Sequence, residues 1–130
     1  AISNGLLVLL GIHQNDTDED MDWMVKKIAG LRIFDDENGL MNLDVMQAGG
    51  DIMVISQFTL LASASKGNRP SYIAAMEPVK AEIAVEKFIQ KLENTIQKPV
   101  STGSFGAHMK ISLVNNGPVT IVLDSKNKES

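Results

Sequence analysis

The stretch Ile52-Met53-Val54-Ile55-Ser56-Gln57-Phe58 decides the fold, because it is the most strongly strand-forming segment of the chain. Apolar residues fill its first four positions, and most of these are β-branched. Such residues pack well on the pleated surface of a sheet. We therefore predict a central strand over residues 52–58, with polar side chains near its end.

Two amphipathic helices are predicted, one before and one after this strand in the sequence. Apolar residues from Met21 to Leu31 recur at helical spacing and follow a group of acids, which predicts a helix over residues 18–30. Residues 15–17, Asn-Asp-Thr, supply N-cap candidates; they also fit a glycosylation sequon, and we favour the cap. A second helix is predicted over residues 79–97, with Pro78 in its first turn.

The remaining apolar segments predict further strands. The run from Gly5 to Ile12 is almost continuously apolar, which is typical of a buried strand. Turns rich in Gly, Asn and Asp separate the other segments. Further strands are predicted over residues 31–34, 108–114 and 119–124, and residues 62–70 are predicted to form a polar loop.

The composition is that of one globular domain. The chain has 130 residues, of which 44% are hydrophobic and 22% charged, and this suffices for a single core. The mixture of strands and helices predicts an α/β fold in which two helices pack on a largely β scaffold. No apolar run is long enough to span a membrane and no signal peptide is visible, so we expect a cytoplasmic location.

Several classes of chemistry are excluded by motifs that the sequence lacks. Cysteine is absent, which excludes disulfides, thiolate catalysis and zinc–cysteine sites. The motifs of zinc proteases, P-loops, Rossmann domains and α/β-hydrolases are absent as well. The formal net charge of −4 argues against an extensive contact with nucleic-acid phosphates. We therefore predict no metal site and no cofactor.

The polar residues at the end of the 52–58 strand allow two interpretations. Ser56, Gln57 and Thr59 cost desolvation energy unless they are paired or face a cleft. In the first interpretation, their side chains bond the local backbone where the chain leaves the sheet. In the second, their hydroxyl and amide groups form the floor of a pocket, together with free backbone N–H groups.

A second unusual segment is Asn115-Asn116-Gly117-Pro118. An Asn-Gly turn between two strands predicts an ordinary β-hairpin. Pro118 has no N–H, so it belongs at the first residue or at the edge of a strand. A Gly-Pro bond also adopts the cis form at a cost of about 0.5–1 kcal/mol, and a cis bond would turn the neighbouring carbonyls in an unusual direction.

Together these segments resemble the D-aminoacyl-tRNA deacylase family, also called the D-tyrosyl-tRNA deacylases. Residues 56–60 resemble its Ser-Gln-Phe-Thr signature, and residues 116–120 resemble its Gly-cisPro signature. The family's N-terminal β-hairpin, which precedes the position of Gly5, has no counterpart here, so we expect residues 1–130 to form a single domain without it. Similar segments follow in the family's order along essentially the whole chain: residues 5–11, 31–34, 41–43, 47–50, 66–70 and 103–109.

The resemblance implies a homodimer whose subunits have two main helices and a three-layer β/β/α sandwich or barrel-like sheet. It implies hydrolysis of the ester that joins a D-amino acid to the 3′-terminal adenosine of tRNA, and also of glycyl-tRNA. The Gly-cisPro segment of one subunit would enter the pocket of the other and exclude L side chains by steric conflict. The alternatives are a related deacylase for a mischarged L-aminoacyl-tRNA and a non-catalytic nucleic-acid-binding module on the same fold.

The resemblance assigns catalysis to Ser56, Gln57, Phe58 and Thr59. The backbone N–H groups of Phe58 and Thr59 would form an oxyanion hole, while the terminal ribose 2′-OH and a water would supply the base. The competing mechanism makes Thr59 a nucleophile, which needs an adjacent base that the local sequence does not show.

Substrate binding is assigned by the resemblance to Gly117, Pro118, Phe105, Lys66 and Arg69. Lys66 and Arg69 are candidates for the phosphates of the tRNA 3′ end; alternatively, they belong to a solvated loop. Phe105 is a candidate for contact with the terminal adenosine, or it packs in the core. The expected partner is therefore the 3′ end of tRNA, and DNA is not expected.

Overall fold

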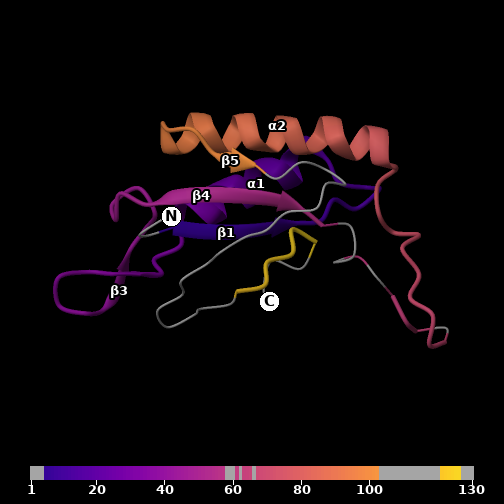
Figure 1. Cartoon of the computed structure of the whole chain (residues 1–130), viewed down its shortest axis with the longest axis horizontal. Coiled ribbons are helices and arrows are strands. Elements are labelled where there is room, and N and C mark those ends of the chain that lie inside the picture. The colour runs from indigo at the N-terminus through magenta and orange to yellow at the C-terminus, as the bar shows by residue number, and fades with distance from the viewer. Residues whose placement is uncertain (1–4, 58–60, 62, 66, 103–120, 127–130) are drawn as a thin grey trace.

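The computed structural model describes residues 5–57, 61, 63–65, 67–102 and 121–126. These residues form a three-stranded sheet, a separate two-stranded sheet and two helices (Figure 1). In chain order the elements are β1 (Gly5–Leu10), α1 (Asp18–Gly30), β2 (Phe34–Asp35), β3 (Met41–Leu43), β4 (Asp51–Ser56), α2 (Pro78–Ile96) and β5 (Ser101–Thr102).

The larger sheet is parallel and has β4 at its centre. Its strand order is β1-β4-β5, and β4 pairs in parallel with both neighbours. The chain crosses from β1 to β4 through α1, and from β4 to β5 through α2. Both crossovers move in the same direction across the sheet. Because connections between parallel strands are right-handed, both helices then lie on the same face of the sheet. The predicted central strand is therefore confirmed, although it ends at Ser56.

The core lies between the sheet and the two helices. Ile52 and Val54 of β4 are fully buried and point towards the helices. Phe88 and Leu92 of α2 and Val25 of α1 complete the centre of this cluster. Figure 1 shows α2 along one side of the molecule, with α1 behind the sheet. The predicted apolar faces of both helices thus form the core.

Both helices begin and end close to the predicted residues. α1 spans 18–30 as predicted, and Thr17 is its N-cap. The Thr17 Oγ1 accepts from the Asp20 N–H across 3.4 Å, while an Asp20 carboxylate oxygen accepts from the Thr17 N–H across 2.8 Å. This reciprocal capping box confirms the cap interpretation of residues 15–17. α2 begins with Pro78 at its first turn and ends before Gln97, which has a left-handed φ of 58°.

The prediction that β1 is fully buried is wrong. Its residues alternate between partly buried and exposed, and Leu7 and Leu9 are 38% and 50% exposed. The physical reason is that both helices cover the same face of the sheet, where Leu6, Val8 and Leu10 pack against the core. We call the opposite face, which carries Leu7 and Leu9, the open face.

Two other predicted strands differ from the structure. The strand predicted over residues 31–34 begins only at Phe34, because Leu31 is the C-cap of α1 and Phe34 pairs with Leu43 of β3. Residues 121–124 are not in a strand, and Ile121 and Val122 are exposed rather than placed in a sheet. The strand predicted over residues 108–114, and residues 119 and 120, lie outside the described residues.

The α/β class with two helices is confirmed, while the finer architecture stays a prediction. The described residues show a mostly parallel sheet with helices on one face, so a third layer and a homodimer remain predictions. Within the described part of the chain, neither helix has the length and apolar character needed to span a membrane.

Candidate active site

The candidate active site lies at the carboxyl end of β4. Ser56, the last residue of β4, pairs with Leu10, the last residue of β1. The backbone N–H of Gln57 donates to the Leu10 carbonyl across 2.8 Å, so the chain leaves the sheet while held against the end of β1. Ser56 and Gln57 are both half-buried. Open α/β sheets bind ligands at the carboxyl ends of their parallel strands, and two of the four predicted catalytic residues lie there.

The segment that leads into α2 borders this end of the sheet. The Ile12 carbonyl accepts from the Met76 N–H across 2.9 Å, and the Gln14 N–H donates to the Ala74 carbonyl across 2.8 Å. Between these two bonds, His13 pairs antiparallel with Ala75. The residues after β1 and the residues before α2 therefore form one short ribbon beside the candidate site.

A hydrogen-bonded loop precedes this ribbon and carries Arg69. Ser63 and Ser71 exchange two backbone hydrogen bonds of 2.7 Å, which close the base of the loop. Gly67 has a φ of 144°, a conformation that side-chain-bearing residues rarely adopt, so glycine is required there. Arg69 is exposed beyond the Ser63–Ser71 pair. Both interpretations of Arg69, a phosphate contact and a solvated loop residue, require this exposure.

A cluster of charged side chains forms just after the end of β1. An Asp20 carboxylate oxygen accepts from the Lys126 Nζ and from the Thr17 N–H, each across 2.8 Å. Only 12% of the Asp20 side chain is exposed. Hydrogen bonds from the Lys126 ammonium and from the Thr17 N–H hold the pKa of Asp20 well below its ordinary value, and the bond from Lys126 has the larger effect. This ion pair joins the start of α1 to the segment 121–126.

His13 and Asp16 belong to the same cluster. The His13 backbone N–H donates to the Asp16 carboxylate across 2.8 Å, and the His13 Nδ1 accepts from the Asn15 N–H across 3.0 Å. Burial raises the pKa of Asp16, and the bond from the His13 N–H opposes that rise. Because Nδ1 accepts a hydrogen bond, the proton of neutral His13 lies on Nε2. His13 is half-buried.

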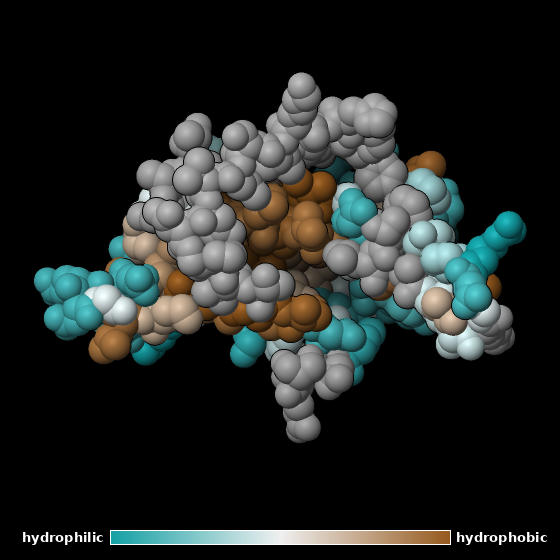
Figure 2. All heavy atoms as spheres, turned by 60° about the horizontal axis from the view of Figure 1, so that its bottom comes forward, coloured by the Kyte–Doolittle hydropathy of each residue, from teal (hydrophilic) through white to brown (hydrophobic). Residues whose placement is uncertain are grey.

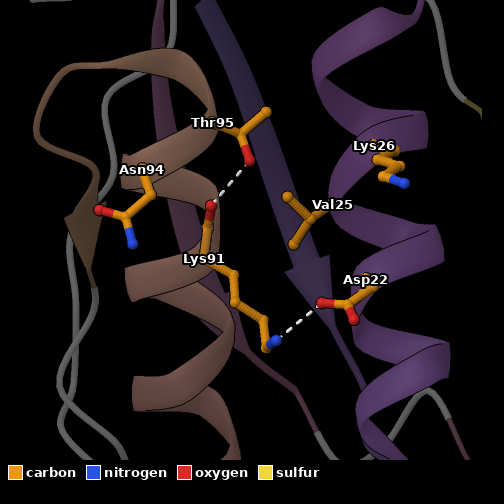
Figure 3. Close-up of a pocket in the computed structure, with 6 residues that line it drawn as sticks. All are labelled: Asp22, Val25, Lys26, Lys91, Asn94 and Thr95. Atoms are coloured by element: carbon orange, nitrogen blue, oxygen red, sulfur yellow. Dashed lines mark hydrogen bonds and ion pairs between the residues drawn. The ribbon is translucent and has the colours of Figure 1, made fainter.

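A groove of about 270 Å³ lies between α1 and α2 (Figure 3). The Lys91 Nζ contacts an Asp22 carboxylate oxygen across 2.7 Å, and the Thr95 Oγ1 donates to the Lys91 carbonyl across 2.9 Å. Of the predicted site residues that the structure describes, Ser56, Gln57 and Arg69, none lines this groove. The Asp22–Lys91 pair joins the two helices across this groove. The lining residues are Asp22, Val25, Lys26, Lys91, Asn94 and Thr95.

The open face of the sheet carries apolar surface. Figure 2 shows hydrophobic surface gathered in the middle of the face that lies at the bottom of Figure 1. Leu7 and Leu9 are exposed on this side of β1, whereas Met53 and Ile55 of β4 are half-buried. Apolar surface gathered in this way is typical of an interaction site.

The structure describes three of the nine predicted site residues. Ser56 and Gln57 lie together at the end of β4, and Arg69 lies on the neighbouring loop. The other six predicted residues lie outside the described part of the chain: Phe58, Thr59, Lys66, Phe105, Gly117 and Pro118. Among the described residues, no group of three or more His, Asp or Glu side chains is arranged to hold a metal ion.

Sequence reasoning missed the ribbon formed by residues 12–14 and 74–76. No local pattern indicates this pairing, because the two segments are far apart in the chain. Sequence reasoning also missed the contact between Asp20 and Lys126. One available signal was the strictly polar composition of the turn after Leu123, which ends in a lysine.

Comparison with known proteins identifies the family. The sequence profile of the family described as D-Tyr-tRNA(Tyr) deacylase matches residues 1–124. A D-aminoacyl-tRNA deacylase of Parabacteroides distasonis is 59% identical over 128 residues, which cover 98% of this chain and 85% of the relative. A D-aminoacyl-tRNA deacylase of Bacteroides thetaiotaomicron is 54% identical over 129 residues, covering 99% of this chain and 86% of the relative.

Solved structures agree with this result. The structure of a c-Myc DNA Unwinding Element Binding Protein superposes with a TM-score of 0.84 at 40% sequence identity, covering 92% of this chain and 81% of the other. A probable eukaryotic D-amino acid tRNA deacylase superposes with a TM-score of 0.61 at 14% identity, covering 80% of this chain and 75% of the other. The second likeness shows a shared fold. The family profile and the close relatives confirm the resemblance read from the sequence: this chain belongs to the D-Tyr-tRNA(Tyr) deacylase family and is an enzyme of that family.

Proposed function

We propose that this chain hydrolyses the ester bond of D-aminoacyl-tRNA, releasing free tRNA and the D-amino acid, and that it also hydrolyses glycyl-tRNA. Relatives that are 54–59% identical over nearly the whole chain carry the name D-aminoacyl-tRNA deacylase. The observation that carries the proposal is structural. The Ser56–Gln57 signature leaves the sheet at the carboxyl end of the central parallel strand, beside the end of β1.

The proposed reaction needs little from side chains, because an aminoacyl ester is already activated. A water attacks the ester carbonyl, the carbonyl carbon–oxygen bond to the ribose breaks, and the leaving ribose oxygen takes a proton. The terminal 2′-OH orients the water and relays its proton: it accepts a proton from the attacking water as it passes its own proton to the leaving ribose oxygen. Backbone N–H groups at Phe58 and Thr59 stabilise the negative charge on the carbonyl oxygen, a contribution typically worth about 3–4 kcal/mol. The competing role for Thr59 is nucleophilic attack on the ester.

Selectivity for D-amino acids is proposed to come from a second subunit. In a homodimer, the Gly117–Pro118 segment of one chain would complete the pocket of the other. A cis bond would direct backbone carbonyls towards the α-amino group of the substrate. An L side chain would then collide with this backbone, whereas a D side chain would point to open space. Glycine has no side chain and would not collide.

The direct test is hydrolysis of matched substrates. D-aminoacyl-, L-aminoacyl- and glycyl-tRNA with the same tRNA are incubated with the purified chain, and released amino acid is measured. We expect catalytic release from the D-aminoacyl- and glycyl-tRNA and retention of the L-aminoacyl ester. Rapid release from the L-aminoacyl-tRNA would favour the related deacylase for mischarged L-amino acids instead.

A second candidate function is nucleic-acid binding without catalysis. It is favoured by the likeness to the c-Myc DNA Unwinding Element Binding Protein, whose name refers to DNA. The net charge of −4 argues against a broad phosphate contact. Saturable binding of tRNA or of single-stranded DNA, with no release of amino acid from any of the three substrates, would support this function over hydrolysis.

A further inference from the structure

The chain between Asp51 and Glu77 has an unusual charge for this protein. It contains no acidic residue and carries Lys66 and Arg69, whereas the whole chain has a formal net charge of −4. This part of the chain leaves the end of β4 and returns to it as the ribbon of residues 74–76. An anionic partner that reaches the candidate active site therefore meets its most favourable local charge along this path.

Two exposed hydrophobic side chains follow Arg69 in this path, three and four residues further along the chain. Tyr72 is 39% exposed and Ile73 is 81% exposed. The backbone on either side of them is held in place. Ser71 is bonded to Ser63 in both directions, and the Ala75 N–H donates to the Tyr72 carbonyl across 2.9 Å. The aromatic ring is therefore presented from a fixed backbone, which lowers the entropy cost of using it for binding.

Tyr72 is also close to the candidate active site. Ala74 and Met76 are bonded to Gln14 and Ile12, which follow the end of β1. Six residues of extended chain and one strand spacing then separate Tyr72 from the Leu10 carbonyl, so the two lie within about 25 Å. An unpaired RNA end of a few nucleotides spans a distance of this order.

We infer that Tyr72 is a stacking platform for the unpaired bases at the 3′ end of the tRNA, with Arg69 beside it for a phosphate. Single-stranded RNA is bound by stacking its bases on exposed aromatic rings, and cationic side chains follow its backbone. An exposed tyrosine on a fixed backbone, three residues after Arg69 in a stretch without acids, matches both requirements. The inference rests on the proposed function, because it assigns the bound strand to the RNA that carries the amino acid.

The test couples a change in the protein to a change in the RNA. Equilibrium binding is measured for deacylated tRNA and for the same tRNA without its unpaired 3′ nucleotides. Truncation should weaken binding to the wild-type chain at least about tenfold, because it removes the base stacked on Tyr72 together with the other 3′ contacts. Tyr72→Ala should bind the intact tRNA about tenfold more weakly, and truncation should weaken its binding about tenfold less than it weakens binding to the wild type. Tyr72→Phe keeps the ring and should bind like the wild type.

Controls separate this inference from a loss of structure and from the proposed function. Val79→Ala removes an exposed apolar side chain from α2 and should change neither binding constant. In the hydrolysis assay, Tyr72→Ala should raise KM about tenfold and leave kcat within about twofold, and Tyr72→Trp should restore KM. An equal loss with intact and truncated tRNA, or a loss in Tyr72→Phe as large as in Tyr72→Ala, would overturn the inference. A wild-type chain that shows the coupling but releases no amino acid would overturn only the proposed hydrolysis.

Discussion

At the scale of single residues, the Asp20–Lys126 ion pair is the contact whose chemistry the structure defines best. The Asp20 carboxylate lies 2.8 Å from the Lys126 Nζ and also accepts from the N-cap residue Thr17. A mostly buried carboxylate with several donors gains more from ionisation than an exposed one. The Asp20–Lys126 ion pair connects the start of α1 to residues 121–126, which follow the predicted Gly117–Pro118 motif in the chain.

This contact predicts a loss of stability in acid. The pKa of Asp20 is lowered in the folded chain, so its contribution to stability is complete above the ordinary carboxyl pKa of about 4 and declines as the pH falls below it. Lys126→Met should lower the free energy of unfolding at neutral pH, and the difference from wild type should shrink in acid. Urea unfolding measured across this pH range tests the prediction.

The matched control is Lys80→Met, which removes an exposed lysine from α2. It should leave the free energy of unfolding nearly unchanged at every pH. A loss in Lys126→Met that stays constant as the pH falls below about 4 would show that Lys126 does not stabilise the ionised form of Asp20.

A second residue-scale prediction separates the two mechanisms proposed for the ester hydrolysis. If backbone N–H groups and the ribose hydroxyl catalyse the reaction, Thr59→Ala retains most of its deacylation rate. A substrate with hydrogen in place of the terminal 2′-OH should then react at least about a hundredfold more slowly, since one well-placed catalytic group is worth that factor. Single-turnover rates of both combinations provide the measurement. Full loss of activity in Thr59→Ala with a normally reacting deoxy substrate would establish Thr59 as the nucleophile.

At the scale of elements, α2 shows how one helix serves both the core and the surface. Phe88 and Leu92 are fully buried against β4, while Val79 and Ile83 on the same helix are 65% and 61% exposed. The helix thus has an apolar core face and additional apolar residues near its N-terminal end. Their different surroundings allow side chains of one chemical type to be compared within one element.

Leu92→Ala should lower the free energy of unfolding by about 2–5 kcal/mol, because it leaves a cavity in a fully packed cluster. Ile83→Ala removes a similar volume from the surface and should change it by less than about 0.5 kcal/mol. Chemical denaturation of both variants measures the difference. Similar losses in the two variants would mean that Ile83 is covered in solution, most simply by another chain.

At the scale of the whole molecule, the open face and the proposed selectivity both concern association. Leu7 and Leu9 are exposed on the open face of β1. Figure 2 shows hydrophobic surface gathered on one face of the molecule. The proposed selectivity requires Gly117 and Pro118 of one chain to reach the Ser56–Gln57 end of β4 in another. A twofold-symmetric dimer would form two equivalent pockets of this kind.

Subunit complementation tests this arrangement. Gln57→Ala would damage one half of the pocket and Gly117→Trp the other, so that each homodimer should lose most of its activity. Mixed dimers contain one pocket with both halves intact, so an equimolar mixture should regain roughly a quarter of the wild-type rate after subunit exchange. Sedimentation measures association at the assay concentration. A fully active monomer, or no recovery on mixing under conditions where exchange is demonstrated, would contradict the dimer.

The sequence alone determined the elements whose signals are local. The 18–30 helix and its cap, the 79–97 helix and the central strand were predicted within a few residues, because apolar periodicity and capping depend on near neighbours in the chain. The family was also identified from short, contiguous signatures. Such signatures can be recognised from the sequence alone because their residues are consecutive.

The tertiary structure decided which face of each element is covered and which distant segments meet. The run after Gly5 reads as buried, but both crossover helices lie on one side of the sheet, so Leu7 and Leu9 are exposed. The ribbon joining His13 to Ala75 and the Asp20–Lys126 pair unite residues far apart in sequence. Pairings of this kind depend on how the whole chain closes around its core, and no local pattern encodes that closure.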